Sequence, residues 1–442
     1  MNDTIAAIST ALGEGGIAII RVSGLDAFTI SGKILSRKNF DTPGKLYLTN
    51  LLDDSQNIID RVLAVRFNAP NTYTGENLAE IHTHGGILIA RLCLDLLLKN
   101  GARPADPGEF TRRAFINGRI DLSQAEGVLT LIKSRSIEAL HAAARTLNGE
   151  LSKIAHNIHD KILDIQGSIE IGLDFPEGEI YESDILLRLE GVINELENLI
   201  SRCSAGMLLN EGVRVVIAGS PNVGKSSLLN ALLGKNRAIV TDIPGTTRDI
   251  INESIIINGV PVILTDTAGL RKSDDVIESE GIKLAQSAIN DSDICLYVID
   301  SSRELNNDEK IFIDSLNDRS IIILNKSDLT QVNQQINSER EQISISAKNL
   351  TGLDELKALI YRIACKDSLL SSGLNTSAGQ LETLNSALDS LRNARDSIIN
   401  CMGEDITAGL LNSARLDLLR VLGLDPSDEL LDSMFSRFCV GK

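Results

Sequence analysis

GSPNVGKSS (219–227) follows the apolar run VRVVIAG and precedes KSSLLNALLG, whose apolar residues recur at helical spacing. This order indicates a strand, a turn and a helix, and the turn matches the pattern GxxxxGK[ST]. Gly219 and Gly224 let backbone N–H groups wrap a phosphate. Lys225 brings positive charge to the outer phosphates, and the Ser226 hydroxyl is placed to bind Mg²⁺. The stretch therefore predicts an α/β nucleotide-binding domain.

Three later motifs, each at the end of a strand-like run, indicate which nucleotide is bound. DTAG (266–269) offers Asp266 to the metal through a water molecule. NKSD (325–328) offers a carboxylate that accepts hydrogen bonds from N1–H and the exocyclic amine of guanine, which adenine does not provide. SAK (346–348) offers a backbone N–H to the guanine carbonyl. In this order the motifs resemble the translation-factor class of GTP-binding domains, so we expect GTP rather than ATP.

The sequence departs from the small regulatory GTPases in its hydrolytic machinery. Leu270 follows DTAG, where those enzymes carry a glutamine that orients the attacking water. TDIPGTTRD (241–249) is the expected switch region, with Thr247 available to Mg²⁺. Asn222 offers an oxygen to a monovalent cation, which would stabilise negative charge near the phosphates. The water-orienting group must come from elsewhere, and the acidic segment RKSDDVIESEG (271–281) either supplies it or is a solvated helix start.

The distribution of strand-like and helical runs indicates several domains. Strands and helices alternate between about 212 and 366, which is typical of a mainly parallel sheet covered on both faces. Sequences with apolar residues at helical spacing flank this region on both sides, while the beginning of the chain mixes strand-like and helical runs. We predict an α+β N-terminal domain (1–118), a discontinuous α-helical domain whose halves (119–210 and 371–442) pack as one bundle, and an inserted α/β P-loop domain (211–370).

Composition limits the classes of function. The whole chain carries 43 Lys and Arg against 60 Asp and Glu, whereas its first 120 residues carry 13 against 12. The net charge of −17 opposes non-specific binding to nucleic acid, so a polyanion should bind near the N-terminal third. Six cysteines without a CxxC pair argue against zinc and disulfide frameworks. With no signal peptide or membrane-spanning run evident, a cytoplasmic protein without membrane contact is expected.

The motifs together resemble a specific family across the whole chain. GSPNVGKSS, TDIPGTTRD, DTAGLR, NKSD, the helical flanks and the terminal FCVGK are similar to the bacterial tRNA-modification GTPase family MnmE, also called TrmE. YTGEN, HGG, RPADPGEFTRRAF and DLSQAEG, which precede the GTPase motifs, extend the resemblance. It implies a Ras-like GTPase domain of the TrmE-Era class and a folate-binding N-terminal domain.

The resemblance also implies an activity, partners and cofactors. Family members work with an FAD-dependent subunit of the MnmG (GidA) type, in a heterotetramer, to modify C5 of the wobble uridine of certain tRNAs. The product is a carboxymethylaminomethyl or aminomethyl uridine, and 5-formyl- or methylene-tetrahydrofolate is the one-carbon donor. Family members form a homodimer through the N-terminal domain, and their GTPase domains close on GTP in a K⁺-dependent manner, with Mg²⁺ bound.

Carried over position by position, the resemblance implies roles for individual residues. Arg21, Glu80, Arg119 and Lys442 fall at the folate contacts, and Glu278 falls at the glutamate that orients the hydrolytic water, with Lys225 as the second catalytic residue. Asn222, Thr241, Ile243 and Thr246 match the K⁺ ligands, and Ser226 and Thr247 match the Mg²⁺ ligands. The implied GTP contacts are Asn222, Val223, Gly224, Lys225, Ser226, Ser227, Thr241, Asp242, Ile243, Pro244, Gly245, Thr246, Thr247, Asp266, Thr267, Ala268, Gly269, Asn325, Lys326, Asp328, Ser346, Ala347 and Lys348.

Several alternatives stay open at this point. A GTP-dependent ribosome-assembly factor would share NKSD and DTAG but not the folate-like N-terminal domain. The segment NTSAGQLETL (375–384) lacks the basic run often seen in the family, so it either contacts tRNA or packs locally. Cys439 lies in the family tail, where local packing is as good an interpretation as catalysis. The tail itself is expected to insert into the folate site.

Overall fold

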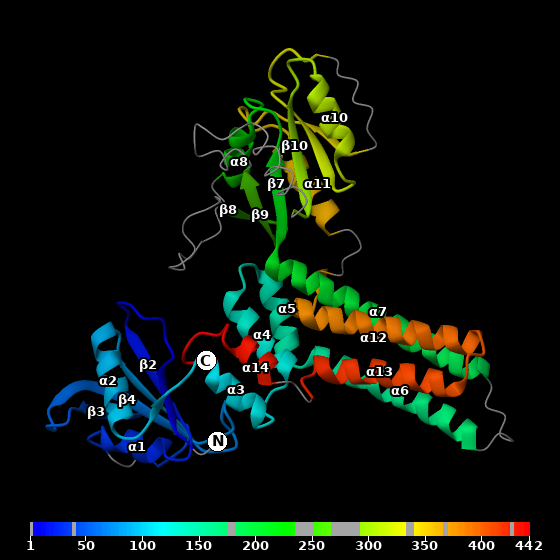
Figure 1. Cartoon of the computed structure of the whole chain (residues 1–442). Helices are drawn as coiled ribbons and strands as arrows, with labels where there is room; N and C mark the ends of the chain where they lie inside the picture. The colour runs from blue at the N-terminus through cyan, green and yellow to red at the C-terminus, as the bar shows by residue number, and fades with distance from the viewer. Residues whose placement is uncertain are drawn as a thin grey trace. The chain divides into compact units, whose positions relative to one another are not determined.

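The structure is a computed structural model that describes residues 3–37, 41–174, 182–234, 252–266, 292–332, 340–365, 370–424 and 428–442. The chain divides into two compact units, residues 1–129 with 412–442 and residues 130–411 (Figure 1). The first unit therefore contains both ends of the chain. The three boundaries between the four segments expected from the sequence remain predictions.

The first unit is built on a six-stranded sheet with the order β3-β4-β5-β2-β1-β6. Its neighbouring strands are antiparallel except for β1 and β6. Alternate residues of β2, including Ala18, Ile20 and Val22, are buried on the face that packs against helices α1 and α2, which confirms the α+β prediction. The strands are β1 (Ile5–Ile8), β2 (Ile17–Ser23), β3 (Tyr47–Leu52), β4 (Ile58–Phe67), β5 (Leu78–His84) and β6 (Arg103–Pro104); the helices are α1 (Ala27–Lys33), α2 (Ile87–Lys99) and α3 (Glu109–Ile116).

The C-terminal segment completes this first unit. Helix α14 (Asp428–Phe435) packs on α3, and the chain then runs to β1. Gly441 has a φ of +94°, and a Cβ there would collide with the Ile8 carbonyl, so only glycine allows this approach. Two helices cross the boundary between the units, α4 (Leu122–Lys133) and α13 (Glu404–Val421).

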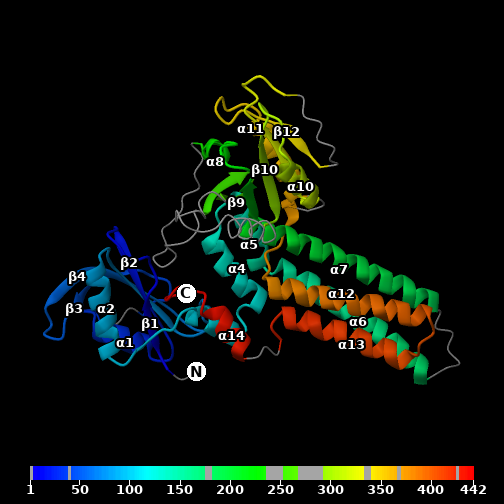
Figure 2. The same cartoon turned by 45° about the horizontal axis from the view of Figure 1, so that its top comes forward.

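The second unit contains long helices from two distant parts of the sequence. Figures 1 and 2 both show α6, α7 and α12 side by side. In α6, Ile158, Ile162, Ile165 and Ile169 are buried at the three- and four-residue spacing of one helical face. The bounds are α5 (Ile137–Leu147), α6 (Glu150–Asp174), α7 (Glu182–Glu211) and α12 (Ala378–Ile399).

Asn375 ties the second helical segment to the first. Its side-chain amide donates to the Thr130 hydroxyl at 2.6 Å, and its backbone N–H donates to the Thr146 hydroxyl at 2.8 Å. Asn375, Thr376 and Gln380 are all buried. The start of the 375–384 segment therefore packs locally, and the prediction of a discontinuous helical domain is confirmed.

A second six-stranded sheet lies between these helical segments in sequence, with the order β12-β11-β10-β7-β9-β8. All neighbours are parallel except β8 and β9. Every residue of the central strand β10 is buried, because two hydrophobic clusters cover the two faces. The strands are β7 (Val213–Ala218), β8 (Asn252–Ile257), β9 (Val260–Asp266), β10 (Ile294–Asp300), β11 (Ser320–Asn325) and β12 (Gln342–Ser344); the helices are α8 (Lys225–Leu233), α10 (Asn307–Ser315), α11 (Leu353–Ala364) and the 3-10 turn η2 (Leu370–Ser372).

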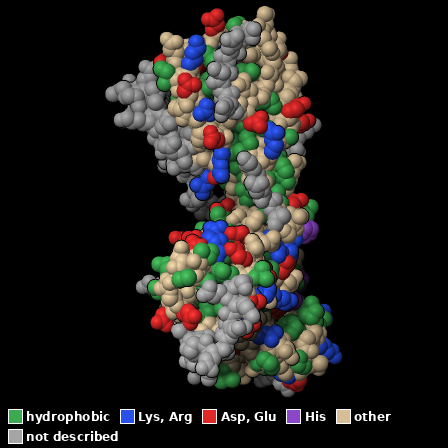
Figure 3. Space-filling model, turned by 90° about the vertical axis from the view of Figure 1, so that its right-hand side faces the viewer, with side chains coloured by type: hydrophobic (Ala, Val, Ile, Leu, Met, Phe, Trp, Pro, Cys, Tyr) green, Lys and Arg blue, Asp and Glu red, His purple; other side chains and the backbone are tan. Residues whose placement is uncertain are grey.

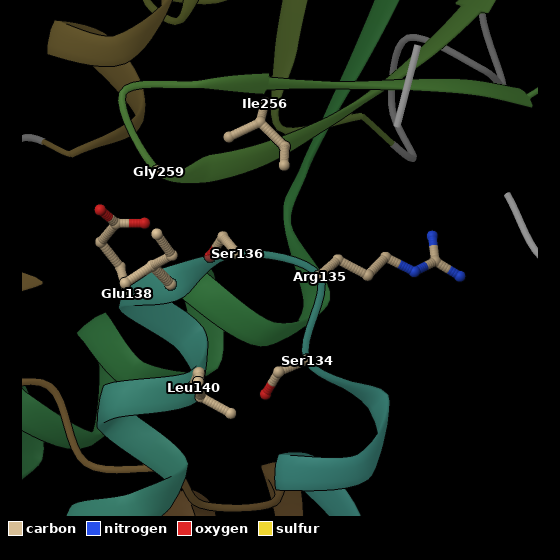
Figure 4. Close-up of a pocket in the computed structure, with 8 residues that line it drawn as sticks. Ser134, Arg135, Ser136, Glu138, Leu140, Ile256 and Gly259 are labelled. Atoms are coloured by element: carbon tan, nitrogen blue, oxygen red, sulfur yellow. The ribbon is translucent and has the colours of Figure 1, made fainter. Parts of the chain in front are cut away.

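The β8–β9 hairpin packs against the start of α5. Its turn residues Asn258 and Gly259 have φ values of +46° and +86°, which fits the two-residue turn typical of an Asn-Gly hairpin. Figure 4 shows Ile256 of the hairpin above the segment Ser134–Ser136, with Glu138 beside Gly259. A cavity of about 410 Å³ lies here, and Ala139 of α5 belongs to the same hydrophobic cluster as the hairpin.

Two surface properties bear on function. On the face in Figure 3, Lys and Arg side chains lie among Asp and Glu side chains, and no extended basic area is visible. Among the described helices, none combines the length and the apolar character needed to cross a bilayer.

Candidate functional site

The phosphate loop (219–224) connects β7 to α8. Gly219 has a φ of +141° and Gly224 of +99°. A Cβ at Gly219 would collide with the Val298 carbonyl, and one at Gly224 with the Asn325 side chain. Both glycines are therefore required by close packing as well as by backbone conformation.

Helix α8 begins at Lys225, so the N–H groups of its first turn face the phosphate loop. The Lys225 ammonium donates to the carbonyl oxygens of Gly219 and Ser220, both at 2.8 Å. These bonds hold the ammonium over the loop. Of the other predicted contacts, Val223 is buried, Asn222 has a φ of +64°, and Ser226 and Ser227 lie in the first turn of α8.

Asn325 joins two of the predicted motifs. Its side-chain amide donates to the Val223 carbonyl at 2.9 Å, and its side-chain oxygen accepts from the Ala347 N–H at 3.1 Å. The side chain is buried, with 2% of the residue exposed. Asn325 therefore braces the phosphate loop against the SAK turn, a contact the sequence interpretation did not foresee.

The predicted guanine-recognition residue Asp328 is held in place by the SAK turn. Its carboxylate accepts a hydrogen bond of 2.6 Å from the Ser346 hydroxyl, which itself accepts from the Asn349 N–H. The Ser346 hydrogen bond lowers the pKa of Asp328 below its ordinary value and so favours the ionised carboxylate. An ionised, oriented carboxylate is what recognition of the two guanine N–H donors requires.

Lys326 makes an ion pair that the sequence interpretation missed. Its ammonium lies 2.6 Å from the carboxylate of Asp300, the last residue of β10. Burial of Asp300 opposes its ionisation, but the Lys326 and Ser302 hydrogen bonds outweigh burial and lower the pKa to about 2. A carboxylate directly after the apolar run ICLYVI was the available sequence signal.

Parallel pairing places these motifs at one edge of the sheet, because β7, β9, β10, β11 and β12 all point the same way. Asp266 ends β9 in register with Ile217 of β7. Lys348 is the last residue of the SAK turn, which follows β12. The predicted residues that lie outside the described residues are Thr241, Asp242, Ile243, Pro244, Gly245, Thr246, Thr247, Thr267, Ala268, Gly269 and Glu278.

A set of acidic, histidine or cysteine ligands for a metal is not found within the described ranges. The oxygen donors expected at the nucleotide edge are of another kind, an amide at Asn222 and a hydroxyl at Ser226. Such donors suit K⁺ and Mg²⁺ when phosphate oxygens complete the coordination.

In the first unit, a cavity of about 320 Å³ opens on β2 and β5. Three of the four residues expected to bind folate line it, namely Arg21, Glu80 and Arg119. The other lining residues are Phe67, Asn71, Thr72, Tyr73 and Leu78.

Arg21 and Glu80 form the polar centre of this pocket. They face each other in register on β2 and β5, and the guanidinium donates to the carboxylate through Nε at 3.0 Å and Nη2 at 2.8 Å. The guanidinium lies 5.8 Å from the ring centroids of both Tyr73 and Phe110. Both charged side chains are mostly buried, at 20% and 16% exposure.

The fourth expected residue, Lys442, reaches this region through its backbone. Its carbonyl accepts from the N–H of Phe110 at 3.2 Å, and the Cys439 carbonyl accepts from the N–H of Gly108 at 3.4 Å. The tail thus contacts Phe110, one of the two aromatic residues beside the Arg21 guanidinium. Lys442 does not line the 320 Å³ pocket itself.

Comparison with known proteins matches the chain along its whole length. Residues 4–119 match the family model of the GTP-binding protein TrmE N-terminus, and residues 122–439 match that of the MnmE helical domain. Among solved structures, the G domain of the T. maritima FeoB iron transporter covers 34% of this chain and 98% of its own, with 26% identity and a TM-score of 0.27.

Three similar relatives share one description. The tRNA modification GTPase MnmE of Carboxydothermus hydrogenoformans is 41% identical, with all of both chains covered. Those of Natranaerobius thermophilus and Lactococcus lactis are 39% and 40% identical, with all of this chain and 99% and 98% of theirs covered. The predicted P-loop domain and the domains that flank it therefore belong to one family of proteins. The chain belongs to the MnmE family of tRNA modification GTPases.

Proposed function

We propose that this protein is a K⁺-dependent GTP hydrolase that drives modification of C5 of the wobble uridine in certain tRNAs. Its MnmE relatives are named tRNA modification GTPases, and the nucleotide edge of its second sheet carries a phosphate loop and an ionised Asp328 suited to guanine. The modification installs a carboxymethylaminomethyl or aminomethyl group. GTP hydrolysis supplies the free energy for the conformational steps of the cycle.

Hydrolysis is assigned to residues of the GTPase motifs. Lys225 stabilises charge on the outer phosphates, and Ser226 with Thr247 binds Mg²⁺. Glu278 orients the attacking water in place of the glutamine that Leu270 replaces. The proposed K⁺ ligands are Asn222, Thr241, Ile243 and Thr246, the last three through backbone carbonyls.

The N-terminal pocket is proposed to bind 5-formyl- or methylene-tetrahydrofolate, which supplies the one-carbon unit. The supporting observation is that Arg21, Glu80 and Arg119, distant in sequence, line one cavity. A carboxylate suits the donor edge of a pterin, guanidinium groups suit the glutamate carboxylates of folate, and Tyr73 and Phe67 add aromatic surface. Lys442 is proposed to present its charge from the docked tail.

The proposed assembly follows the family. Two copies of the chain form a homodimer, which joins an FAD-dependent MnmG-type subunit in a heterotetramer that acts on tRNA. A reducing, cytoplasmic setting is supported by the six cysteines, all of them free thiols.

Nucleoside analysis of tRNA tests this function directly. A deletion strain should lack the modified wobble uridine, and the wild-type gene should restore it. Normal modification in the deletion strain would refute the proposal, and an accompanying defect in ribosomal subunits would favour a ribosome-assembly role.

The cation and the water-orienting residue are tested on the purified protein. GTP hydrolysis should be faster in K⁺ than in Na⁺, and Asn222→Ala should remove the difference. Glu278→Ala should keep GTP binding and lose hydrolysis by about a hundredfold or more. Equal rates in the two salts, or full activity of the Glu278 variant, would remove the corresponding assignment.

A further inference from the structure

The segment RPADPGEFTRRAF (103–115) contains a buried ion-pair cluster that neither the nucleotide site nor the pocket lining uses. Arg113 is 1% exposed. Its guanidinium lies 3.1 Å from Glu76, 3.0 Å from Glu109 and 2.9 Å from Asp3. A charge buried this deeply must be paired, so Arg113 fixes the positions of all three carboxylates.

One of these carboxylates belongs to the loop that lines the 320 Å³ pocket. Thr72 and Tyr73 line the pocket, and the Thr72 hydroxyl donates to the Glu76 carbonyl at 2.7 Å. The Glu76 carboxylate also accepts from the Ser23 hydroxyl at 2.8 Å. We call residues 72–76 the pocket loop. Its last residue is therefore clamped between β2 and Arg113 of α3.

Two more side chains at α3 hold the pocket loop. The Tyr73 and Thr111 hydroxyls are hydrogen bonded at 2.8 Å, and the Asn117 amide, just after the helix, donates to the Thr74 carbonyl at 2.7 Å. With the Glu76 contact, three of the five residues of the pocket loop bind α3 or its end. The shape of the pocket wall thus depends on where α3 lies.

The N-terminal end of the same helix holds the C-terminal tail. Besides the bonds of Gly108 and Phe110 to tail carbonyls, Arg112 pairs with Asp432 of α14 at 3.0 Å. Gly108 has a φ of +69°, and a Cβ there would lie 2.6 Å from the Phe435 carbonyl. Helix α3 therefore contacts the pocket loop and the tail at once.

We propose that Arg113 is a positioning residue that fixes the pocket loop to α3, so that ligand binding in the pocket is coupled to docking of the tail. Coupling of this kind is reciprocal: the docked tail raises ligand affinity, and bound ligand stabilises the docked tail. The ligand part of this inference rests on the folate assignment proposed above, while the link between loop and tail does not.

The matched control is Arg103, which pairs with the same Asp3 at 2.8 Å and the same Glu109 at 2.6 Å. Among the described residues it forms no hydrogen bond or ion pair with Glu76, and its side chain is 40% exposed. Arg103→Gln therefore perturbs the cluster without releasing the pocket loop. Glu76→Gln is a milder second variant, which keeps the size of the side chain and removes its charge.

The first experiment titrates 5-formyl-tetrahydrofolate into the full-length protein by calorimetry. Arg113→Gln should weaken binding about tenfold, and removal of residues 439–442 should weaken it by at least as much, because it also removes Lys442; the double change should be no weaker than tail removal alone. Arg103→Gln should change affinity less than about threefold, and its effect should multiply with that of tail removal. Wild-type affinity of Arg113→Gln, or multiplying effects of Arg113→Gln and tail removal, would overturn the proposal.

A ligand-free experiment separates this inference from the folate assignment. In amide hydrogen exchange, Arg113→Gln and Glu76→Gln should each speed exchange in residues 436–442, and tail removal should speed exchange in the pocket loop. Exchange in α2 should stay unchanged, and so should GTP hydrolysis. If wild-type protein fails to bind the folate but the variants show these changes in exchange, the coupling stands and the folate assignment falls. Unchanged exchange in both segments would overturn the coupling.

Discussion

The phosphate loop takes six consecutive residues between β7 and α8, whereas the N-terminal pocket takes its lining from separate segments between Arg21 and Arg119. In the loop, local geometry does most of the positioning, since two glycines and a helix start suffice to direct backbone N–H groups at a phosphate. In the pocket, sheet pairing and the ion pairs of Arg113 bring the side chains together. A site of the first kind is visible as a motif, and a site of the second kind is visible only in the fold.

The largest effect of a single substitution is expected at Asp328, the residue proposed to recognise guanine. Asp328→Asn should weaken GTP binding about 100-fold, because one ionised acceptor for two N–H donors becomes a neutral amide. Affinity for xanthosine triphosphate should rise, because its 2-oxo group accepts from the new amide. Competition binding with both nucleotides measures the change.

Asp354→Asn is the matched control for that measurement, because it removes a carboxylate that is 97% exposed and remote from NKSD in sequence. It should leave both affinities unchanged. Unaltered GTP binding by Asp328→Asn would remove Asp328 from guanine recognition.

The nucleotide edge also contains a contact that no motif predicts, the Asp300–Lys326 ion pair. Asp300→Asn should lower the free energy of unfolding by about 2 kcal/mol at pH 7, because the folded protein holds the pKa of Asp300 at about 2. Because the folded pKa is below the unfolded value, this stabilisation is complete above about pH 5 and is lost as pH falls towards 2. Urea unfolding of both proteins at pH 7, 5 and 3 measures it. A difference that grew at pH 3 would contradict the assignment.

The contrast also explains how much the sequence predicts. Alternation of strands and helices around GSPNVGKSS predicts the inserted α/β domain, and apolar spacing predicts the helices on either side. The roles of Arg21, Glu80 and Arg119 came from family resemblance, because an isolated charge in a sequence is indistinguishable from a surface charge. The contacts of Asn325 with Val223 and of Arg113 with Glu76 are not predictable from the sequence, because each partner lies far away along the chain.

Loss of a single charge in the N-terminal pocket should weaken ligand binding less than loss of the Asp328 charge weakens GTP binding. Glu80→Gln should weaken binding of 5-formyl-tetrahydrofolate about tenfold, because the variant keeps the size of the side chain but loses the charge that we propose to face the pterin. Calorimetry on the full-length protein measures the affinity. Asp54→Asn, at a carboxylate that is 65% exposed in the same unit, should have no effect. Equal affinity of the Glu80 variant and wild type would place the ligand elsewhere.

The smallest effect is expected where neither site lies, at the turn of the β8–β9 hairpin beside α5 (Figure 4). Gly259→Ala should cost roughly 1 kcal/mol of unfolding free energy, because the turn needs a φ of +86° and the new Cβ would meet the Glu138 side chain. In a Glu138→Ala background the cost should fall by about 0.5 kcal/mol, since only the backbone strain remains. Gly379→Ala in α12, where a Cβ meets nothing within 4 Å, should be neutral or stabilising. Urea unfolding of the five proteins measures these values. Equal costs in both backgrounds would show that α5 and the hairpin do not press on each other through Glu138, and that the turn, like the phosphate loop, is set by local geometry alone.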